Sequence, residues 1–384
     1  MSKPLAIVMG FIGKLPVAGM SFYNLHYIAG LHALGYDVHY IERQNKPDEY
    51  YNPDTNAMTD QPSYALDYLK YLLPRSGITE GHFSLIDREQ NCHGSDWSSL
   101  RDALNCADFL LTLCDPAWFD ELERCSRRAF VDGDPLFTQA QMINGQTIKA
   151  NALEHYDTLF TYGTRMGAAD CTIPAVGRQW IPTRPVVATK LWDATPPPNS
   201  APVTALLHWA AGSDVNYNGR IYGHKNREFE RFIELPKRSR QPFALAVGGD
   251  APRARLRENG WNLVNPLDAT RTIEAYQGFI VGSRADFGIA KHAYVASRSG
   301  WFSDRSTCYL AAGRPVLHQD TGCGDWLPTG EGVFLFSDVE DVLEALNRLD
   351  ADYDRHAQAA RRIAEEHFEA ATVIGHMLDE AGFR

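Results

Sequence analysis

The sequence has no Cys-x-x-Cys pair, the spacing that proteins commonly use to hold zinc or to carry out thiol redox chemistry. The cysteines are odd in number and scattered, at Cys92, Cys106, Cys114, Cys125, Cys171, Cys308 and Cys323. Such a pattern is typical of reduced thiols. We therefore expect a cytoplasmic protein that has neither disulfides nor a zinc cluster.

Long apolar runs are missing as well. No segment reaches the roughly 18 uninterrupted apolar residues that a membrane helix requires. The apolar residues 5–12 lack the basic flank and the small-residue cleavage site of a signal peptide. They predict a first buried strand, and the chain as a whole predicts no membrane span.

Positive charge is in short supply. Lys and Arg number 37 against 48 Asp and Glu, which gives a net charge of −11. The overall field of such a chain repels polyanions and anionic membrane surfaces. Nucleic acid is therefore not an expected partner.

The remaining composition is that of a globular protein, with 384 residues, 44% hydrophobic and 22% charged. At roughly 100–200 residues per domain, this length predicts two domains. A proline-rich segment, Ala194-Thr-Pro-Pro-Pro-Asn-Ser-Ala-Pro202, suits neither a helix nor an interior strand and indicates a linker. We expect an N-terminal domain at 1–185, the linker at 186–202, a C-terminal domain at 203–352 and a C-terminal helix at 353–384.

Both halves have the pattern of an α/β fold. An apolar run ends at Gly10, residues 20–34 have helical spacing, and residues 36–41 alternate as a strand does. This strand–helix–strand unit indicates a parallel sheet. In the second half we expect strands at 203–209, 243–247, 277–281, 293–296 and 314–317.

Polar or glycine residues follow several of the expected strands in the first half. Ligands of open parallel sheets bind beyond the carboxyl ends of the strands, so these residues mark a candidate cleft. The residues expected along this edge include Gly13, Lys14, Asp115, Asp132 and Asp134.

Residues 296–316 predict the end of a strand, a glycine-containing loop and a short helix that ends at Gly313. Ser303 is a good N-cap for this helix, whose free amides and dipole would suit a diphosphate. The predicted phosphate contacts are Arg298, Ser299, Gly300, Ser303 and Arg305. The alternative is an ordinary strand–loop–helix connection in which Ser303 only caps the helix.

Other cations precede this segment. Arg284 and Lys291 are predicted to complete a diphosphate clamp, with the arginine as a fork and the lysine as a point charge. Arg220 and Lys225 follow the first strand of the second domain and are weaker candidates. Solvated surface charge is the alternative for each of the four.

The helix that ends in Ala311-Ala312-Gly313-Arg314-Pro315-Val316, late in the second of two α/β domains, resembles the donor-nucleotide segment of GT-B glycosyltransferases. Residues 10–42 and 329–336 are similar to other parts of that fold, and residues 297–316 look like a bacterial glycosyltransferase-like group. The resemblance implies two Rossmann-like domains that face a cleft, with a C-terminal helix bracing the N-terminal domain. It also implies a nucleotide diphosphate sugar as donor substrate, a UDP-sugar above others, and no tightly bound cofactor.

The resemblance is incomplete at one point. Two glutamates of the large retaining GT-B group fall here on Gly300 and Cys308, which cannot bind a hydroxyl as a carboxylate does. Asp304 is then the expected partner of the ribose hydroxyls. The fold also implies that the amides of Gly13 and Gly19, beside Lys14, approach the transferred sugar or the departing phosphate.

A base must take the proton of an acceptor hydroxyl, and the carboxylates at strand ends are the candidates. Asp132 and Asp134 are the best placed, with Asp115 third, although an Asx-turn around Gly133 is the alternative. Asp132-Gly-Asp134 has the Asp-x-Asp spacing that holds a metal in the other glycosyltransferase fold. The two-domain pattern argues against that assignment, so we expect no metal.

The sequence therefore predicts a glycosyltransferase that moves a sugar from a nucleotide diphosphate sugar to the hydroxyl of an unknown acceptor. Three alternatives stay open: a nucleotide-sugar 2-epimerase of the same fold, a non-catalytic protein that binds sugar nucleotides, and a DNA-base glucosyltransferase. The acidic balance of the chain disfavours the last of these.

Overall fold

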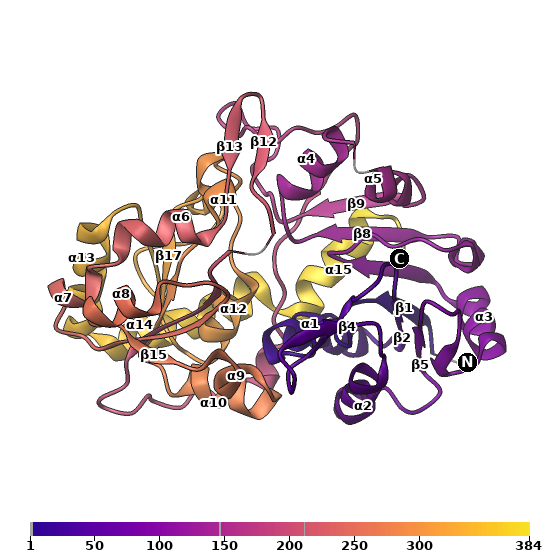
Figure 1. Ribbon diagram of the computed structural model, residues 1–384, viewed down its shortest axis with the longest axis horizontal. Helices are drawn as coiled ribbons and strands as arrows, with labels where there is room; N and C mark the ends of the chain where they lie inside the picture. Colours follow the sequence, from indigo (N-terminus) through magenta and orange to yellow (C-terminus); the bar gives the residue numbers. More distant parts are fainter. Residues whose placement is uncertain (1–2, 146, 211) are drawn as a thin grey trace.

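The computed structural model describes residues 3–145, 147–210 and 212–384, and two sheets lie side by side in it (Figure 1). The first sheet has the strand order β10-β9-β8-β7-β1-β2-β5-β6, parallel except for β6. Its strands are β1 (Leu5–Met9), β2 (Asp37–Arg43), β5 (Phe83–Ile86), β6 (Cys92–Gly94), β7 (Phe109–Leu113), β8 (Arg128–Asp132), β9 (Thr158–Thr161) and β10 (Ile181–Pro182).

The second sheet is parallel throughout, in the order β15-β14-β11-β16-β17-β18. Its strands are β11 (Val203–His208), β14 (Phe243–Gly248), β15 (Asn262–Val264), β16 (Ala285–Gly288), β17 (Val316–Gln319) and β18 (Val333–Phe336). Two hairpins lie outside the sheets, formed by β3 (Tyr50–Asn52) with β4 (Ala57–Thr59) and by β12 (Val215–Tyr217) with β13 (Arg220–Tyr222).

Helices connect the strands of both sheets. In the first half these are α1 (Ala18–Ala33), α2 (Ser63–Leu72), α3 (Trp97–Cys106), α4 (Phe137–Ile143) and α5 (Thr147–Glu154). In the second half they are α6 (Lys225–Phe229), α7 (Leu235–Arg238), α8 (Arg253–Glu258), α9 (Pro266–Thr270), α10 (Ile273–Val281), α11 (His292–Ala296), α12 (Asp304–Ala311), α13 (Val339–Ala351), α14 (Tyr353–Ile363) and α15 (Ala370–Glu380). None of the helices in the described residues is both long and apolar enough to cross a bilayer.

Two strands expected in the second half are helices. Residues 277–281 form the end of α10, and residues 293–296 lie in α11; the strand between them is β16. Short apolar runs do not separate a strand from a buried helix by periodicity alone. The helix is visible in the spacing of Tyr276 and Ile280, which are four residues apart and both buried.

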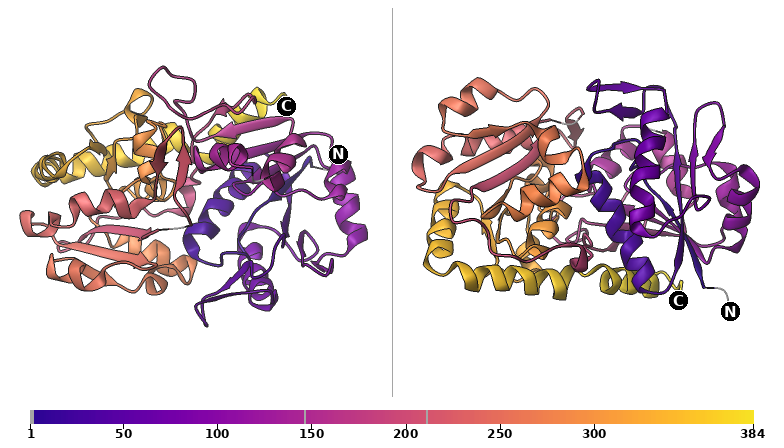
Figure 2. Two further views of the ribbon diagram at one scale, coloured as in Figure 1. Left: turned by 45° about the horizontal axis from the view of Figure 1, so that its top comes forward. Right: turned by 90° about the horizontal axis from the view of Figure 1, so that it is seen from below.

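The C-terminal helix returns to the first half, as the resemblance implied. The right view of Figure 2 shows the yellow helices running from the second sheet to the first. α15 packs against α1 so closely that a Cβ on Gly30 would lie 2.6 Å from Ile374 and 2.9 Å from Ala370. The linker takes part, because the amide of Val187 donates to the carbonyl of Phe368.

The two halves also meet beside the sheets. The amides of Arg165 and Thr172, beyond β9, donate to the carbonyls of Ser299 and Ser297. Arg165 forms an ion pair with Asp325 at 2.6 Å. One continuous cluster of buried apolar side chains includes residues from both sheets and from their flanking helices.

Candidate active site

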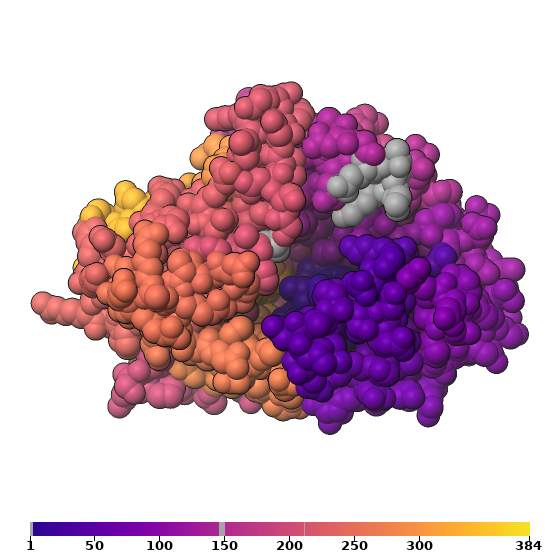
Figure 3. Space-filling view, in the orientation of Figure 1, coloured from indigo at the N-terminus to yellow at the C-terminus, as the bar shows by residue number. Residues whose placement is uncertain are grey.

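A cleft of about 760 Å³ lies between the two halves. Figure 3 shows it as a hollow between the indigo surface of the first half and the orange surface of the second. Residues beyond the carboxyl ends of the parallel strands line it, as expected for open α/β sheets. The charged residues of its lining are Lys14, Lys46, Asp48, Glu49, Asp115, Asp134, Lys225, Lys291, Asp304 and Arg305.

The start of α12 forms part of the second-half wall. Ser303 is the N-cap of this helix, as the sequence predicted, and its side chain lines the cleft without capping the helix. Arg305 is nearly buried, donating to the carbonyl of Leu206 at 2.8 Å and to the Asp286 carboxylate at 3.2 Å. Its buried Nε has no hydrogen-bond partner in the described part of the chain.

Two lysines add positive charge beside Arg305. Burial, together with the positive charges of Arg305 and Lys291, lowers the pKa of Lys225 to about 7. Within the described residues, the Lys225 side chain makes no hydrogen bond or ion pair. The wall therefore gathers three cations beside the cleft, and such side chains can bind an anion.

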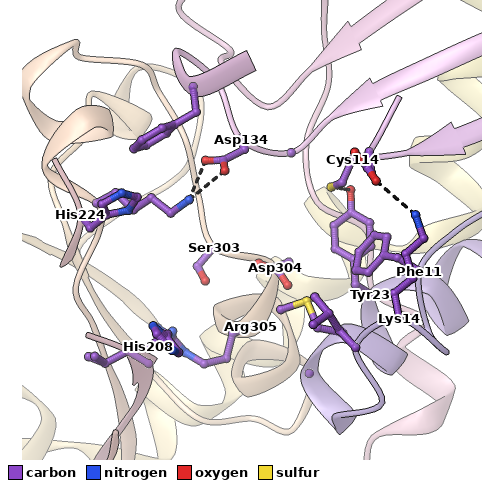
Figure 4. Close-up of a pocket in the computed structure, with 18 of the residues that line it drawn as sticks. Phe11, Lys14, Tyr23, Cys114, Asp134, His208, His224, Ser303, Asp304 and Arg305 are labelled. Atoms are coloured by element: carbon purple, nitrogen blue, oxygen red, sulfur yellow. Dashed lines mark hydrogen bonds and ion pairs between the residues drawn. The ribbon is translucent and has the colours of Figure 1, made fainter. Parts of the chain in front are cut away.

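Asp134 faces this wall from the first half. Its two carboxylate oxygens each accept a hydrogen bond from Lys291 Nζ at 2.8 Å, and Oδ1 also accepts one from the Tyr294 hydroxyl. Figure 4 shows Asp134, Ser303 and Asp304 around one open space. The side chain of Asp134 remains 42% exposed, so it is accessible to a molecule in the cleft.

Asp304 is the first residue of α12 and lines the same space. Burial raises the pKa of its carboxyl, against the stabilising charges of Arg305 and Lys225 and the amides at the start of the helix. A carboxyl in this position can accept hydrogen bonds from hydroxyl groups of a bound molecule.

The first-half wall pairs Lys14 with two carboxylates. Lys14 Nζ lies 3.1 Å from Glu49 and 3.4 Å from Asp115, whose side chain is 41% exposed. The backbone here is held from behind by buried Glu42, which accepts the amides of Gly13 at 2.7 Å and Lys14 at 3.1 Å. The prediction that the Gly13 amide contacts substrate is therefore wrong, because a carboxylate already occupies it.

Asp132 does not line the cleft. It is fully buried and accepts hydrogen bonds from Thr138 at 2.7 Å, Gln139 at 2.9 Å and Thr161 at 3.1 Å. The amide of Asp134 also donates to it, which is the Asx-type turn considered as the alternative. Asp132 holds the loop in place, and its predicted role as a base is wrong.

Several predicted phosphate contacts lie elsewhere. Arg284 precedes β16, at the amino edge of the sheet, where it pairs with Asp350 at 2.6 Å. Arg298 pairs with Asp170 at 2.7 Å, and Arg220 is exposed on the β12–β13 hairpin outside the cleft lining. These three assignments are wrong: Arg284 lies at the amino edge of the sheet, Arg298 is paired outside the cleft, and Arg220 lies on an exposed hairpin.

Ser299 and Gly300 serve the contact between the halves and do not line the cleft. Ser299 accepts the Arg165 amide, and the Gly300 carbonyl accepts the Thr164 hydroxyl at 2.9 Å. Gly300 has φ of +75°, and a Cβ there would lie 2.2 Å from Thr164 Oγ1. Their predicted phosphate roles are corrected to structural ones.

The sequence reasoning missed several residues of the site. Tyr23 and Cys114 line the cleft together, with Cys114 Sγ donating to the Tyr23 hydroxyl at 3.1 Å. Cys114 has φ of +60°, and burial raises its pKa to about 12. Tyr294, which donates to Asp134, was also missed. A lone aromatic or cysteine carries no distinguishing pattern, whereas Asp286, charged inside an apolar strand, did offer a signal.

The described residues hold no group of three or more His, Cys, Asp or Glu side chains arranged to bind a metal ion.

Comparisons with known proteins bear on this geometry. Residues 227–380 match a family model described as glycosyl transferase-like. An alpha-glucosyltransferase solved with UDP and a 13-mer DNA containing an HMU base superposes with a TM-score of 0.58 at 10% identity, covering 100% of both chains. The chain has the GT-B fold. HepE from Anabaena, solved with UDP-glucose, superposes with a TM-score of 0.56 at 10% identity, covering 99% of this chain and 100% of its own.

No curated protein matches the sequence. The GT-B fold confirms the predicted pair of Rossmann-like domains that face a cleft. It accounts for the position of the site as well, because the carboxyl edges of both sheets meet there.

Proposed function

We propose that this GT-B protein transfers a glycosyl group from a nucleoside diphosphate sugar, a UDP-sugar above others, to an acceptor hydroxyl. One observation carries the proposal: cations gather at the start of α12 and face the Asp134 carboxylate across the cleft. A glycosyl donor leaves a diphosphate behind, and an acceptor hydroxyl requires a base. In this proposal the cations of the second-half wall bind the diphosphate, and the carboxylate of the first-half wall acts as the base.

Lys225, Lys291 and Arg305 are proposed to bind the diphosphate. Arg305 Nε is a buried donor without a hydrogen-bond partner in the described residues. The Lys225 side chain forms no hydrogen bond or close ion pair there, and the charges of Asp304 and Asp286 act on it only from a longer distance. The Ser303 hydroxyl lies beside them in the cleft lining. As the bond to the sugar breaks, charge grows on the leaving oxygen, and positive groups already in place stabilise it.

Asp304 is proposed to accept hydrogen bonds from ribose or sugar hydroxyls. The raised pKa of its carboxyl reflects burial, which a hydroxyl donor would offset by hydrogen bonding to the charged form. Asp304 would then take the place of the glutamates that are missing at Gly300 and Cys308, since it lies between these two positions.

Asp134 is the proposed base, with Asp115 as the second candidate. Both line the first-half wall and are partly exposed, so an acceptor held on that wall can reach them. The same wall also carries Asp48 and Glu49. Carboxylates repel a polyanion, so we propose a neutral acceptor in preference to DNA.

Similarity to proteins solved with UDP and UDP-glucose supports the choice of donor. Calorimetric titration of the protein with UDP-, GDP-, ADP- and TDP-sugars tests it. We expect binding of the UDP compounds and at least tenfold weaker binding in Lys225→Met, because a charge-assisted contact to phosphate is lost. Lys237→Met, which removes an exposed cation of α7, is the matched control and should bind normally.

Turnover assays separate the proposed function from its alternatives. Release of UDP that depends on an added acceptor supports transfer. Conversion of the sugar nucleotide without any acceptor would indicate the epimerase, and tight binding without turnover under every acceptor would indicate a binding protein. Failure of all four classes of sugar nucleotide to bind would refute the proposal.

A further inference from the structure

Two anionic groups compete for the ammonium group of Lys291. In the structure its ammonium group donates to both carboxylate oxygens of Asp134 at 2.8 Å, across the cleft between the halves. In the proposed function the same ammonium group contacts the donor diphosphate. A diphosphate carries more negative charge than one carboxylate, and the side chain of Asp134 is 42% exposed and well solvated. The diphosphate is therefore the stronger competitor.

The surroundings of Lys291 allow it to change partners without moving the domains. Its Nζ lies 4.6 Å from the ring centre of Phe137 and 5.5 Å from that of Tyr294, and both aromatic faces attract a cation. Trp301 separately fixes the loop that carries Asp134, because its indole nitrogen donates to the Gly133 carbonyl at 3.2 Å. Only the flexible lysine side chain has to move.

We propose that the Asp134–Lys291 pair is a donor-sensitive latch that controls the base. This inference rests on the proposed function. Without donor, Lys291 neutralises Asp134 and lowers its basicity. When the diphosphate takes Lys291, Asp134 keeps the hydrogen bond from Tyr294 and becomes a stronger base, because an adjacent positive charge has been withdrawn.

In the transfer step one bond forms and one bond breaks. The acceptor oxygen forms a bond to the anomeric carbon while the bond from that carbon to the diphosphate oxygen breaks. The electron pair of the broken bond leaves with the nucleoside diphosphate, which Lys225, Lys291 and Arg305 stabilise. The proton of the acceptor hydroxyl passes to Asp134. Tyr294 is a positioning residue, since its hydroxyl holds the Asp134 carboxylate.

A double-mutant cycle on UDP affinity tests the latch. The competition predicts that Asp134→Asn frees Lys291 and tightens UDP binding about threefold to tenfold, whereas Lys291→Met weakens it. In the double variant Asp134→Asn/Lys291→Met, the Asn substitution should no longer tighten UDP binding. The UDP affinity of the double variant should therefore equal that of Lys291→Met. The full-length proteins are compared by calorimetry, after thermal unfolding has shown that each is folded; Asp134→Ser replaces Asp134→Asn if the latter fails to fold.

The cycle distinguishes the latch from a general charge effect. If the gain from removing the carboxylate persists without Lys291, simple repulsion between Asp134 and UDP explains it and the latch is refuted. An unchanged or weaker affinity in Asp134→Asn refutes it too. If the unaltered protein does not bind UDP or any other sugar nucleotide, the proposed function itself fails, whereas normal UDP binding without coupling overturns the latch alone.

Turnover supplies a second readout. Tyr294→Phe should lower kcat and leave UDP affinity within about twofold of the unaltered protein, because Tyr294 holds Asp134 and not the donor. A parallel loss of UDP affinity in Tyr294→Phe would assign that residue to donor binding and contradict its positioning role.

Discussion

At the scale of single residues, the charge on Lys225 depends on the space around it. Its side chain is partly buried beside Arg305 and Lys291, and burial, the largest cause, together with these charges lowers its pKa to about 7. The group therefore titrates close to neutral pH, where an ordinary lysine stays charged. Its sequence position predicted a cation near the cleft, but not that its charge would depend on pH near neutrality.

This titration predicts a pH dependence of UDP binding. Below pH 7 Lys225 is already protonated, so in the proposed function it contacts the diphosphate without proton uptake. Above pH 7 the free protein must take up a proton to restore that contact, so the affinity for UDP should fall between pH 7 and 9. Calorimetry in buffers of different ionisation enthalpy measures this proton uptake. Lys225→Met should bind more weakly and lose most of the uptake; an unchanged uptake would contradict the assignment.

At the scale of elements, α12 was predictable because local signals mark both of its ends. Ser303 precedes the helix as its N-cap and Gly313 follows it with φ of +67°. Residues 277–281 and 293–296 were mistaken for strands because they offered apolar character without a clear period. The signals at helix ends are local chemistry, whereas the choice between a buried strand and a buried helix depends on packing partners far along the chain.

The close packing of α1 against α15 gives a prediction about stability. Glycine weakens a helix interior by about 0.8–1.0 kcal/mol relative to alanine, so Gly→Ala normally stabilises a helix. At Gly30 a Cβ would lie within 3.0 Å of the Ala370 backbone, and overpacking costs about 1–3 kcal/mol. Gly30→Ala should therefore lower the melting temperature. Gly278→Ala, in α10 with nothing within 4 Å of the new Cβ, is the control and should raise it.

Both changes are read by calorimetric or fluorescence-monitored unfolding of the full chain. A stabilising effect of Gly30→Ala would mean that the two helices can separate without cost. The return of α15 would then contribute little to holding the first half.

At the scale of the whole molecule, the two-domain plan follows from a repeated strand–helix pattern and a proline-rich break. The contacts that join the halves do not follow from either feature. Lys291 and Asp134 are 157 positions apart, and Trp301 reaches the Gly133 carbonyl over 168 positions. Their partners are set by how two finished sheets face one another, which explains why Asp132 and Asp134, two residues apart, differ in burial and in partners.

Two buried histidines, His26 and His318, predict how the stability of the folded protein changes in acid. His26 on α1 accepts the amide of Ala188 in the linker and contacts Cys308 Sγ of α12 at 3.6 Å, so it touches both halves. His318 on β17 is fully buried against the ring of Phe302. Burial lowers the pKa of each to about 3. The unfolded chain binds these protons near pH 6.5, so both residues withdraw stability as the pH falls from about 6.5 toward 3.

Each histidine contributes a slope of up to about 1.4 kcal/mol per pH unit in this range. Burial raises the pKa of Glu42, Asp132 and Asp304, which act with the opposite sign, so the prediction concerns the difference between two profiles. His318→Phe keeps an aromatic ring against Phe302 and removes the titration. Its melting temperature should fall less steeply between pH 6.5 and 5 than that of the unaltered protein, while His376→Gln, at an exposed position, should leave the profile unchanged. Parallel profiles for His318→Phe and the unaltered protein would show that the acid response of the fold has another origin.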